Sequence, residues 1–235
     1  MIAIRPPEYF PRLAYTGLLM HVDHFVLADT FQYSKQTFQN RSKLRNPNGW
    51  QWITVPLFHQ HGRAIQEAVI DENDKRWRER HWRAFMYNYR STMYFEFFED
   101  TFQPFFERNW ERLGPCTCRS VELTAELLDI ETRITRASSL DGQPDTVADI
   151  LTTVGADTLV APEKVAAHDA DAAPEVQVYR FEHPTYRQNF EGFEPDMSAM
   201  DAVFNYGPDA RRLIREGGRA PEPLSHGDKS GGNKS

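Results

Sequence analysis

The chain has 235 residues, of which 40% are apolar and 26% are charged. These values are typical of a globular protein and exclude a wholly disordered chain or a coiled coil. The net charge of −7 argues against duplex nucleic acid as the main partner. No stretch reaches the roughly 18 apolar residues of a membrane span. The first residues lack a secretory leader, so we expect a cytoplasmic protein.

The amino-terminal part is predicted to contain a strand, a helix and a second strand. Residues 1–4 are an apolar run that Pro6 and Pro7 end, because proline cannot donate to a strand ladder. Residues 12–20 have helical spacing. Residues 24–28 form another short apolar run, which is typical of a buried strand.

The middle of the chain is predicted to be helical and rich in aromatic residues. It is preceded by a strand at 50–55 and a weaker strand at 65–70. Aromatic side chains recur every three or four residues over 77–89 and 98–113. We expect Gly114-Pro115 to end the second of these helices. The many aromatic side chains predict a well-packed core.

Strands and helices alternate in the carboxyl-terminal part. The predicted strands are 130–135, 158–160 and 176–181, and the predicted helices are 121–128, 147–154 with Gly155 as its end, and a short one near Lys164. This alternation favours an α/β fold with a mainly parallel sheet flanked by helices. We predict one domain over residues 1–216. Glycine, proline, serine and charged residues over 217–235 predict a disordered tail.

The loop from Arg5 to Pro11 is the first candidate for ligand binding. It follows a strand, and parallel α/β sheets bind ligands at the carboxyl ends of their strands. Arg5 and Tyr9 are the candidate ligand-binding residues in this loop. The alternative is that its prolines only stiffen a turn.

Polar residues gather again after the second strand. Asp29 stands at the strand end, where a functional carboxylate is often found. Lys35 and Arg41 can bind a phosphate or a carboxylate, and Gln32 and Asn40 can bind hydroxyl or amide groups. The alternative is a loop whose aromatic residues pack and whose charges face water.

Two histidines are candidate acid–base residues, because histidine titrates near neutral pH. His81 lies on the aromatic helix face, where a histidine is more often a core residue. His183 follows the last predicted strand. Tyr186 and Asn205 are the candidate ligand-binding residues that come after it. Cys116 and Cys118 have the wrong spacing for a zinc site, so we predict no metal and interpret both as structural.

The order of these blocks resembles the WbqC-like family. Residues 5–15 are similar to the family's opening His-Gln-Pro-x-Tyr-x-Pro-Trp-x-Gly-Tyr pattern, and residues 29–35 to its Asp-x-x-Gln-Phe-x-Lys block. Residues 181–188 resemble Phe-x-His-Pro-x-Tyr-x-Gln, and residues 198–207 resemble Ser-x-x-Asp-x-x-Phe-Asn-x-Gly. The resemblance covers residues 1–215.

This resemblance implies a transferase of bacterial surface-polysaccharide (O-antigen) biosynthesis. Such a protein would pass glycine or another small acyl group to a nucleotide-linked amino sugar, so its partner would be a small-molecule substrate. No cofactor is assigned. Arg5 stands where the family pattern has histidine, which leaves a catalytically inactive ligand-binding protein as an alternative. A fold-level analogy of the first strand, loop and helix to nucleotidyltransferases leaves an adenylating or nucleotidyl-transferring enzyme as another.

The transferase hypothesis assigns a role to each kind of residue. His81 or His183 would take the proton from the attacking amine, and Asp29 would orient that amine. Lys35 and Arg41 would bind phosphates or the oxyanion. These residues are far apart in the chain, so the hypothesis expects them to line one cleft.

Overall fold

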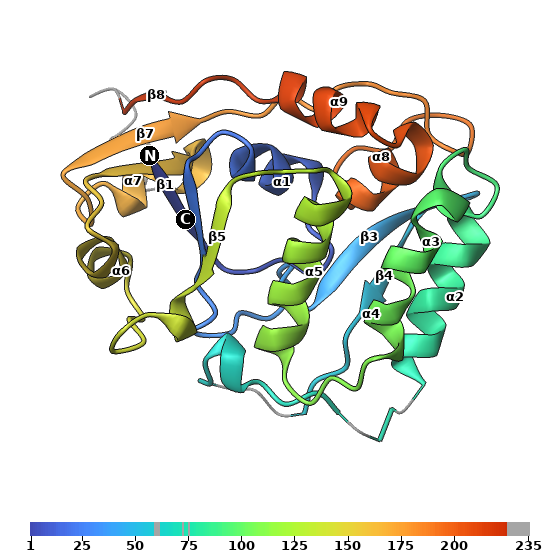
Figure 1. Ribbon diagram of the computed structural model, residues 1–235, viewed down its shortest axis with the longest axis horizontal. Helices are drawn as coiled ribbons and strands as arrows, with labels where there is room; N and C mark the ends of the chain where they lie inside the picture. The colour runs from blue at the N-terminus through green and yellow to red at the C-terminus, as the bar shows by residue number, and fades with distance from the viewer. Residues whose placement is uncertain (59–61, 72, 75, 225–235) are drawn as a thin grey trace, which may run out of the picture.

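A mainly parallel sheet forms one end of the molecule (Figure 1). The computed structural model describes residues 1–58, 62–71, 73–74 and 76–224. Within them, the sheet has the order β5-β2-β1-β6-β7-β8. All neighbours are parallel except β7 and β8. The strands are β1 (Ile2–Arg5), β2 (His24–Leu27), β5 (Arg133–Arg136), β6 (Thr158–Pro162), β7 (Glu175–Tyr179) and β8 (Glu222–Pro223). The predicted α/β class is confirmed.

Helices cover both faces of this sheet. The helices α1 (Leu13–Leu19) and α5 (Leu113–Leu127) pack on one face, and α6 (Val147–Val154) and α7 (Glu163–Asp169) pack on the other. Counted along the chain, the five parallel strands have the order 3-2-1-4-5. In such doubly wound sheets ligands bind where the strand order reverses. That point lies here at the carboxyl ends of β1 and β6.

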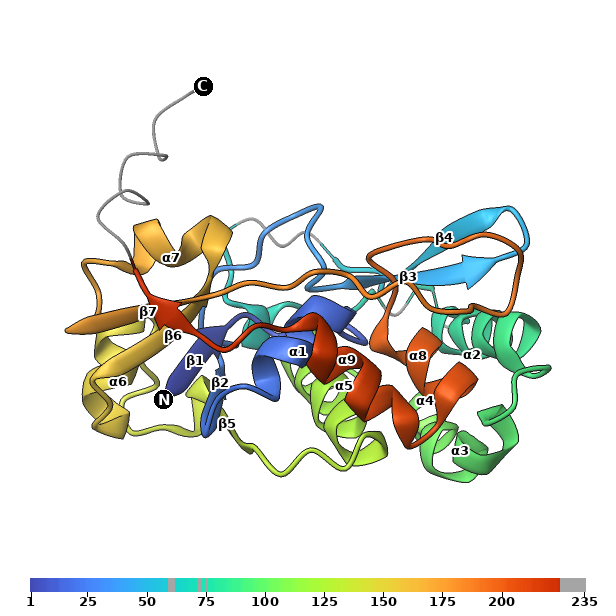
Figure 2. The same ribbon diagram turned by 90° about the horizontal axis from the view of Figure 1, so that it is seen from above.

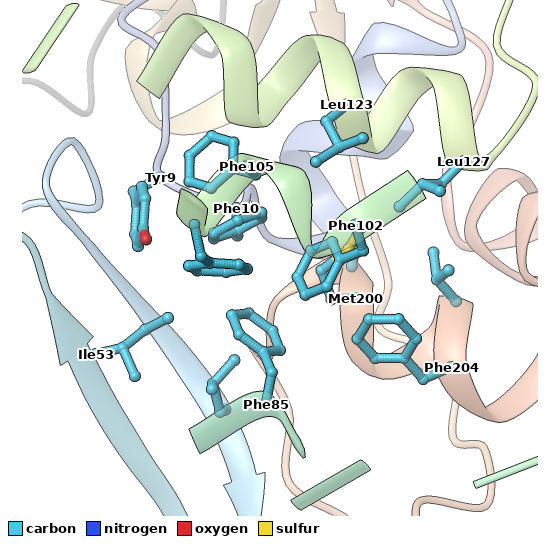
Figure 3. Close-up of a cluster of buried hydrophobic side chains, with 14 of the residues drawn as sticks. Tyr9, Phe10, Ile53, Phe85, Phe102, Phe105, Leu123, Leu127, Met200 and Phe204 are labelled. Atoms are coloured by element: carbon cyan, nitrogen blue, oxygen red, sulfur yellow. The ribbon is translucent and has the colours of Figure 1, made fainter. Parts of the chain in front are cut away.

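The aromatic-rich elements form the other end of the molecule, where a hairpin lies beside α2 (Figure 2). The elements there are β3 (Arg41–Asn46), β4 (Gly49–Thr54), α2 (Trp77–Tyr89), α3 (Phe95–Phe102), α4 (Pro104–Glu107), α8 (Ala199–Tyr206) and α9 (Asp209–Gly217). Two short 3₁₀ helices are η1 (Ile65–Glu67) and η2 (Ala137–Ser139). Figure 3 shows Phe10, Phe85, Phe102 and Phe204 converging from four segments. Their ring centroids lie 4.8–6.2 Å apart where they touch, the spacing of favourable aromatic pairs.

The expected helix end at Gly114-Pro115 is wrong, because this pair lies in the first turn of α5. The first backbone N–H groups of a helix have no partner within it, so proline is tolerated there. A Cβ on Gly114 would lie 2.5 Å from the Cα of Gln66, so the close approach of η1 requires a glycine. The predicted helix over 98–113 is instead divided near Pro104, which begins α4.

Three further differences concern strands. The weak strand expected at 65–70 is the helix η1 followed by isolated bridges at Val69 and Ile70. Arg41, the last residue of the polar block predicted after the second strand, begins β3, a strand that the sequence did not predict. Past Gly217, residues 222–223 add β8 to the sheet.

Residues 225–235 of the predicted tail lie outside the described residues. In the described part of the chain, no helix is long and apolar enough to span a membrane.

Candidate functional site

A cleft opens at the carboxyl ends of β1, β6 and β7, where the strand order reverses. Its volume is about 460 Å³, within the range of about 300–1,000 Å³ for small-molecule sites. Charged and aromatic side chains line it: Arg5, Glu8, Arg12, Tyr15, Lys164, Tyr179, Phe181, His183 and Asp196. The position and chemistry of the cleft make it the candidate functional site.

His183 and Asp196 form a hydrogen-bonded pair in this cleft. The Nε2 of His183 lies 3.0 Å from the Oδ1 of Asp196, and this bond lowers the pKa of Asp196. Asp196 has a φ of 62°, in the left-handed region that few residues adopt. A carboxylate on Nε2 favours the tautomer with its proton there and a lone pair on Nδ1. His183 is 22% exposed, so it can act as an acceptor for a ligand.

Of the arginines that line the cleft, Arg5 has the fewest carboxylate contacts among the described residues. Its only ion-pair contact there is a long one of 4.0 Å to Asp169. Arg12, in contrast, makes two bonds of 3.1 and 2.6 Å to the carboxylate of Glu8. A guanidinium has five donors in a fork that matches carboxylate or phosphate. Arg5 is therefore the main candidate for binding an anionic group.

Two tyrosine hydroxyls at the cleft are buried without a hydrogen-bond partner among the described residues. They belong to Tyr15 and Tyr179, both of which line the cleft. Burial raises the pKa of both, so both hydroxyls are protonated at neutral pH. A buried polar group left unpaired costs about 1–3 kcal/mol. The hydroxyl of Tyr179 lies against Gly17 and Gly218, which do not line the cleft. A polar ligand in the cleft would therefore relieve that cost only at Tyr15.

Of the residues predicted from the sequence, the cleft brings together Arg5 and His183. Asp29 lies at the end of β2, where its carboxylate accepts bonds from the backbone N and the Oγ of Ser138 at 2.9 and 2.6 Å. The other predicted catalytic residue, His81, is buried in the aromatic core with its Nδ1 2.9 Å from the hydroxyl of Tyr9. Tyr9, a predicted ligand-binding residue, is also fully buried there and does not line the cleft. Burial lowers the pKa of His81 to about 3, so its ring is neutral at pH 7.

Three other predicted residues make hydrogen bonds inside the protein. The hydroxyl of Tyr186 donates to the Oδ2 of Asp201 at 2.7 Å. The Nδ2 of Asn205 donates to the backbone carbonyl of Asp201 at 2.7 Å. The Nδ2 of Asn40 donates to the carbonyl of Val55 at 2.9 Å. These side chains connect elements to one another and do not line the cleft.

The last three predicted residues lie before or on the hairpin. Gln32 and Lys35 are exposed in the loop that follows β2. The guanidinium of Arg41 lies over the ring of Trp52, 4.1 Å from its centroid. The structure therefore does not bring the whole predicted set into one cleft.

Sequence reasoning missed several residues of the cleft. Arg12 and Tyr15 follow the first candidate loop and lie in the family-like block of residues 5–15, Arg12 at the N-cap of α1 and Tyr15 on it, so their position in the chain was a usable signal. Asp196 carried no such signal, because it meets His183 only after the chain has turned back over 13 residues. Tyr179 was hidden in the predicted strand that became β7.

Comparisons with known proteins identify the family of the chain. A sequence model of the WbqC-like protein family matches residues 6–213, which include His183 and Asp196, and Arg5 immediately precedes this region. An uncharacterized protein of Mycobacterium tuberculosis, Rv1507c, is 31% identical over 229 residues, or 91% of this chain and 97% of that protein. No solved structure matches the chain significantly.

Proposed function

The chain belongs to the WbqC-like protein family, and we propose that it is a transferase that passes a small acyl group, such as glycyl, to the amine of a nucleotide-linked amino sugar. The reaction would take place in the cleft at the carboxyl ends of β1, β6 and β7. The pair of His183 and Asp196, in the same cleft as Arg5, is the observation that supports this proposal most directly.

His183 is the proposed general base. The amine nitrogen attacks the carbonyl carbon of the activated acyl group and forms a C–N bond, while the bond to the leaving group breaks. The leaving group departs with the bonding electron pair, and the amine proton passes to the Nδ1 of His183. Asp196 accepts the hydrogen bond from Nε2, so it holds the ring and stabilises the imidazolium that forms.

Arg5 is the proposed binding residue for the donor. An activated acyl donor leaves as an anion, such as a phosphate, and a guanidinium with unused donors stabilises that charge as it develops. Arg5 replaces the histidine of the family pattern with a permanent cation. The base then has to come from elsewhere in the cleft, and His183 meets that requirement. In this proposal Asp29 and His81 have structural roles.

Mass spectrometry would test the proposal with a nucleotide-linked amino sugar and an activated glycine, such as glycyl adenylate. The expected product is the sugar carrying one glycyl group. His183→Ala should lower its rate by about 100-fold or more, the usual contribution of a general base. Arg5→Ala should lower it as well.

Matched controls are available outside the cleft. His168 is exposed on α7, and Arg133 is exposed at the opposite edge of the sheet on β5. The variants His168→Ala and Arg133→Ala should keep the wild-type rate. A protein that forms no adduct with any activated donor, or whose rate is unaffected by His183→Ala, would contradict the proposal.

A second candidate function is nucleotidyl transfer, which the strand order favours. The order 3-2-1-4-5 and a cleft at its reversal point are typical of nucleotide-binding sheets. This function predicts release of pyrophosphate from a nucleoside triphosphate, which a coupled phosphate assay would measure. Pyrophosphate release without acyl transfer would favour it over the first candidate.

A further inference from the structure

One face of the β3–β4 hairpin carries alternating cations and aromatic rings. We call Phe38, Arg41, Lys43, Trp50 and Trp52 the hairpin ladder. In the hairpin register Lys43 is opposite Trp52, and Trp50 lies two residues along β4. The Nζ of Lys43 is 4.4 Å from the ring centroid of Trp50, and the guanidinium carbon of Arg41 is 4.1 Å from that of Trp52.

The hairpin ladder continues into the cleft. The guanidinium of Arg12, which lines the cleft, lies 3.8 Å over the ring of Phe38. The ring of Phe38 is 5.4 Å from that of Trp52, which is 5.4 Å from that of Trp50. Asp196, the partner of His183, is also close enough for Lys43 and Arg12 to lower its pKa. A ligand that extended out of the cleft would therefore pass directly onto the hairpin ladder.

The charge of the hairpin ladder favours an anionic ligand. Arg41 donates to the backbone carbonyls of Thr37 and Gln36, and neither Arg41 nor Lys43 forms an ion pair with a carboxylate among the described residues. Asp196 is near enough to Lys43 for its pKa to be lowered, but without an ion pair both cations keep donors for a ligand. Trp50 is 40% exposed although Lys43 lies over its ring. The hairpin ladder thus offers an accessible aromatic ring next to two cations.

These features match a nucleoside diphosphate better than an uncharged ligand or a simple anion. A nucleobase stacks on an aromatic ring, and phosphates pair with lysine and arginine. We propose that the hairpin ladder binds the nucleoside diphosphate arm of the substrate, with the base on Trp50 and the phosphates against Lys43 and Arg41. The amino sugar then reaches His183 in the cleft. This inference rests on the proposed function, because it assigns the nucleotide part of the same substrate.

Calorimetric titration of the full chain with UDP, ADP and inorganic pyrophosphate would test this inference. Trp50→Ala should weaken UDP and ADP binding by about tenfold or more, because base stacking typically contributes about 5-fold to 150-fold in affinity. It should leave pyrophosphate binding unchanged, since pyrophosphate has no ring. Lys43→Ala should weaken the binding of all three ligands.

Two further variants make the result specific. Phe97, which is 71% exposed on α3, is the control for loss of an exposed aromatic ring, and Phe97→Ala should bind like the wild type. Trp50→Phe should keep most of the affinity for UDP and ADP. If circular dichroism showed Trp50→Ala to be unfolded, the comparison of Lys43→Gln with the wild type would decide the test, with weaker pyrophosphate binding expected.

The inference is overturned if Trp50→Ala binds UDP and ADP like the wild type, or if neither nucleotide binds at millimolar concentration. Its failure differs from that of the proposed function. Nucleotide binding that depends on Trp50, without acyl transfer from any donor, would leave the hairpin ladder standing and reject the transferase. Transfer that depends on His183, with a KM unaffected by Trp50→Ala and Lys43→Ala, would reject only the hairpin ladder.

Discussion

Asp201 should make the stability of the protein depend on pH in a direction unusual for a carboxylate. It is fully buried on α8. Burial raises its pKa from 3.8 to about 6, although hydrogen bonds from Tyr186, Tyr89 and Gln188 lower it in part. The guanidinium of Arg45 binds the carbonyl of Gly49 and the side chain of Gln188 and forms no ion pair with this carboxylate. The Oδ1 of Asp201 has no hydrogen-bond partner among the described residues.

The sign of the effect follows from proton linkage. A group whose pKa is higher in the folded state binds its proton more tightly there, so its contribution to stability is complete below pH 3.8. That contribution is lost as the pH rises through about 6. A difference from 3.8 to about 6 corresponds to about 3 kcal/mol, at 1.36 kcal/mol for each pKa unit. Asp201→Asn does not titrate, and should gain about 3 kcal/mol relative to the wild type between pH 3.5 and pH 8.

Urea unfolding of both proteins across this pH range would measure the effect as the difference between two free energies of unfolding. Taking the difference removes the contributions of the other titrating groups. Asp196→Asn is the control of opposite sign, because the bond to His183 lowers the pKa of Asp196. Its wild-type contribution is present above pH 3.8 and is lost as the pH falls. Parallel stability curves for the wild type and Asp201→Asn would refute the reasoning.

Three other variants test the core. Burial lowers the pKa of His81 to about 3, so the unfolded state binds the proton more tightly and the wild type loses stability as the pH falls below 6.5. His81→Gln should reduce this loss. Identical acid unfolding of the two proteins would contradict this. Phe204→Ala should lower the free energy of unfolding, measured in urea, by about 3–5 kcal/mol. The reason is that the buried ring of Phe204 contacts those of Phe85, Phe95 and Phe102. A loss below 1 kcal/mol would show that the cluster repacks. Gly114→Ala should lower the free energy of unfolding by about 1–3 kcal/mol, because the new Cβ would meet the backbone at Gln66. An unchanged midpoint of urea unfolding would show that η1 moves aside at little cost.

The sequence predicted those parts of the fold that local patterns determine. The strands β1, β2 and β6 are short, mainly apolar runs. Gly155 ends α6 in the left-handed conformation that favours glycine. The pair Gly114-Pro115 fits both the end of one helix and the first turn of the next. Only the tertiary approach of Gln66 distinguishes these two possibilities, so the sequence pattern alone was misleading.

The candidate site was harder to predict, because it depends on where the loop after β7 returns. Arg5 and His183 could be identified, since each stands at or just after the end of a strand that borders the cleft. The pairing of His183 with Asp196 needs a left-handed residue and a chain reversal, which no local pattern reports. The sequence likewise did not show that His81 is buried, which keeps its ring neutral at pH 7.

Unused hydrogen-bonding capacity separates the polar residues of this chain into two groups. Asp29, Asn40, Tyr186 and Asn205 bond to atoms of the protein itself, so substituting them would mainly change stability. Groups at the cleft instead retain donors or acceptors that nothing in the described residues uses, such as the guanidinium of Arg5 and the hydroxyl of Tyr15. Buried polar groups are normally paired, so those left unpaired at a concave surface indicate where a ligand supplies the partner. The residue blocks that resemble the family therefore contain both kinds of residue, and only the geometry shows which of them line the cleft.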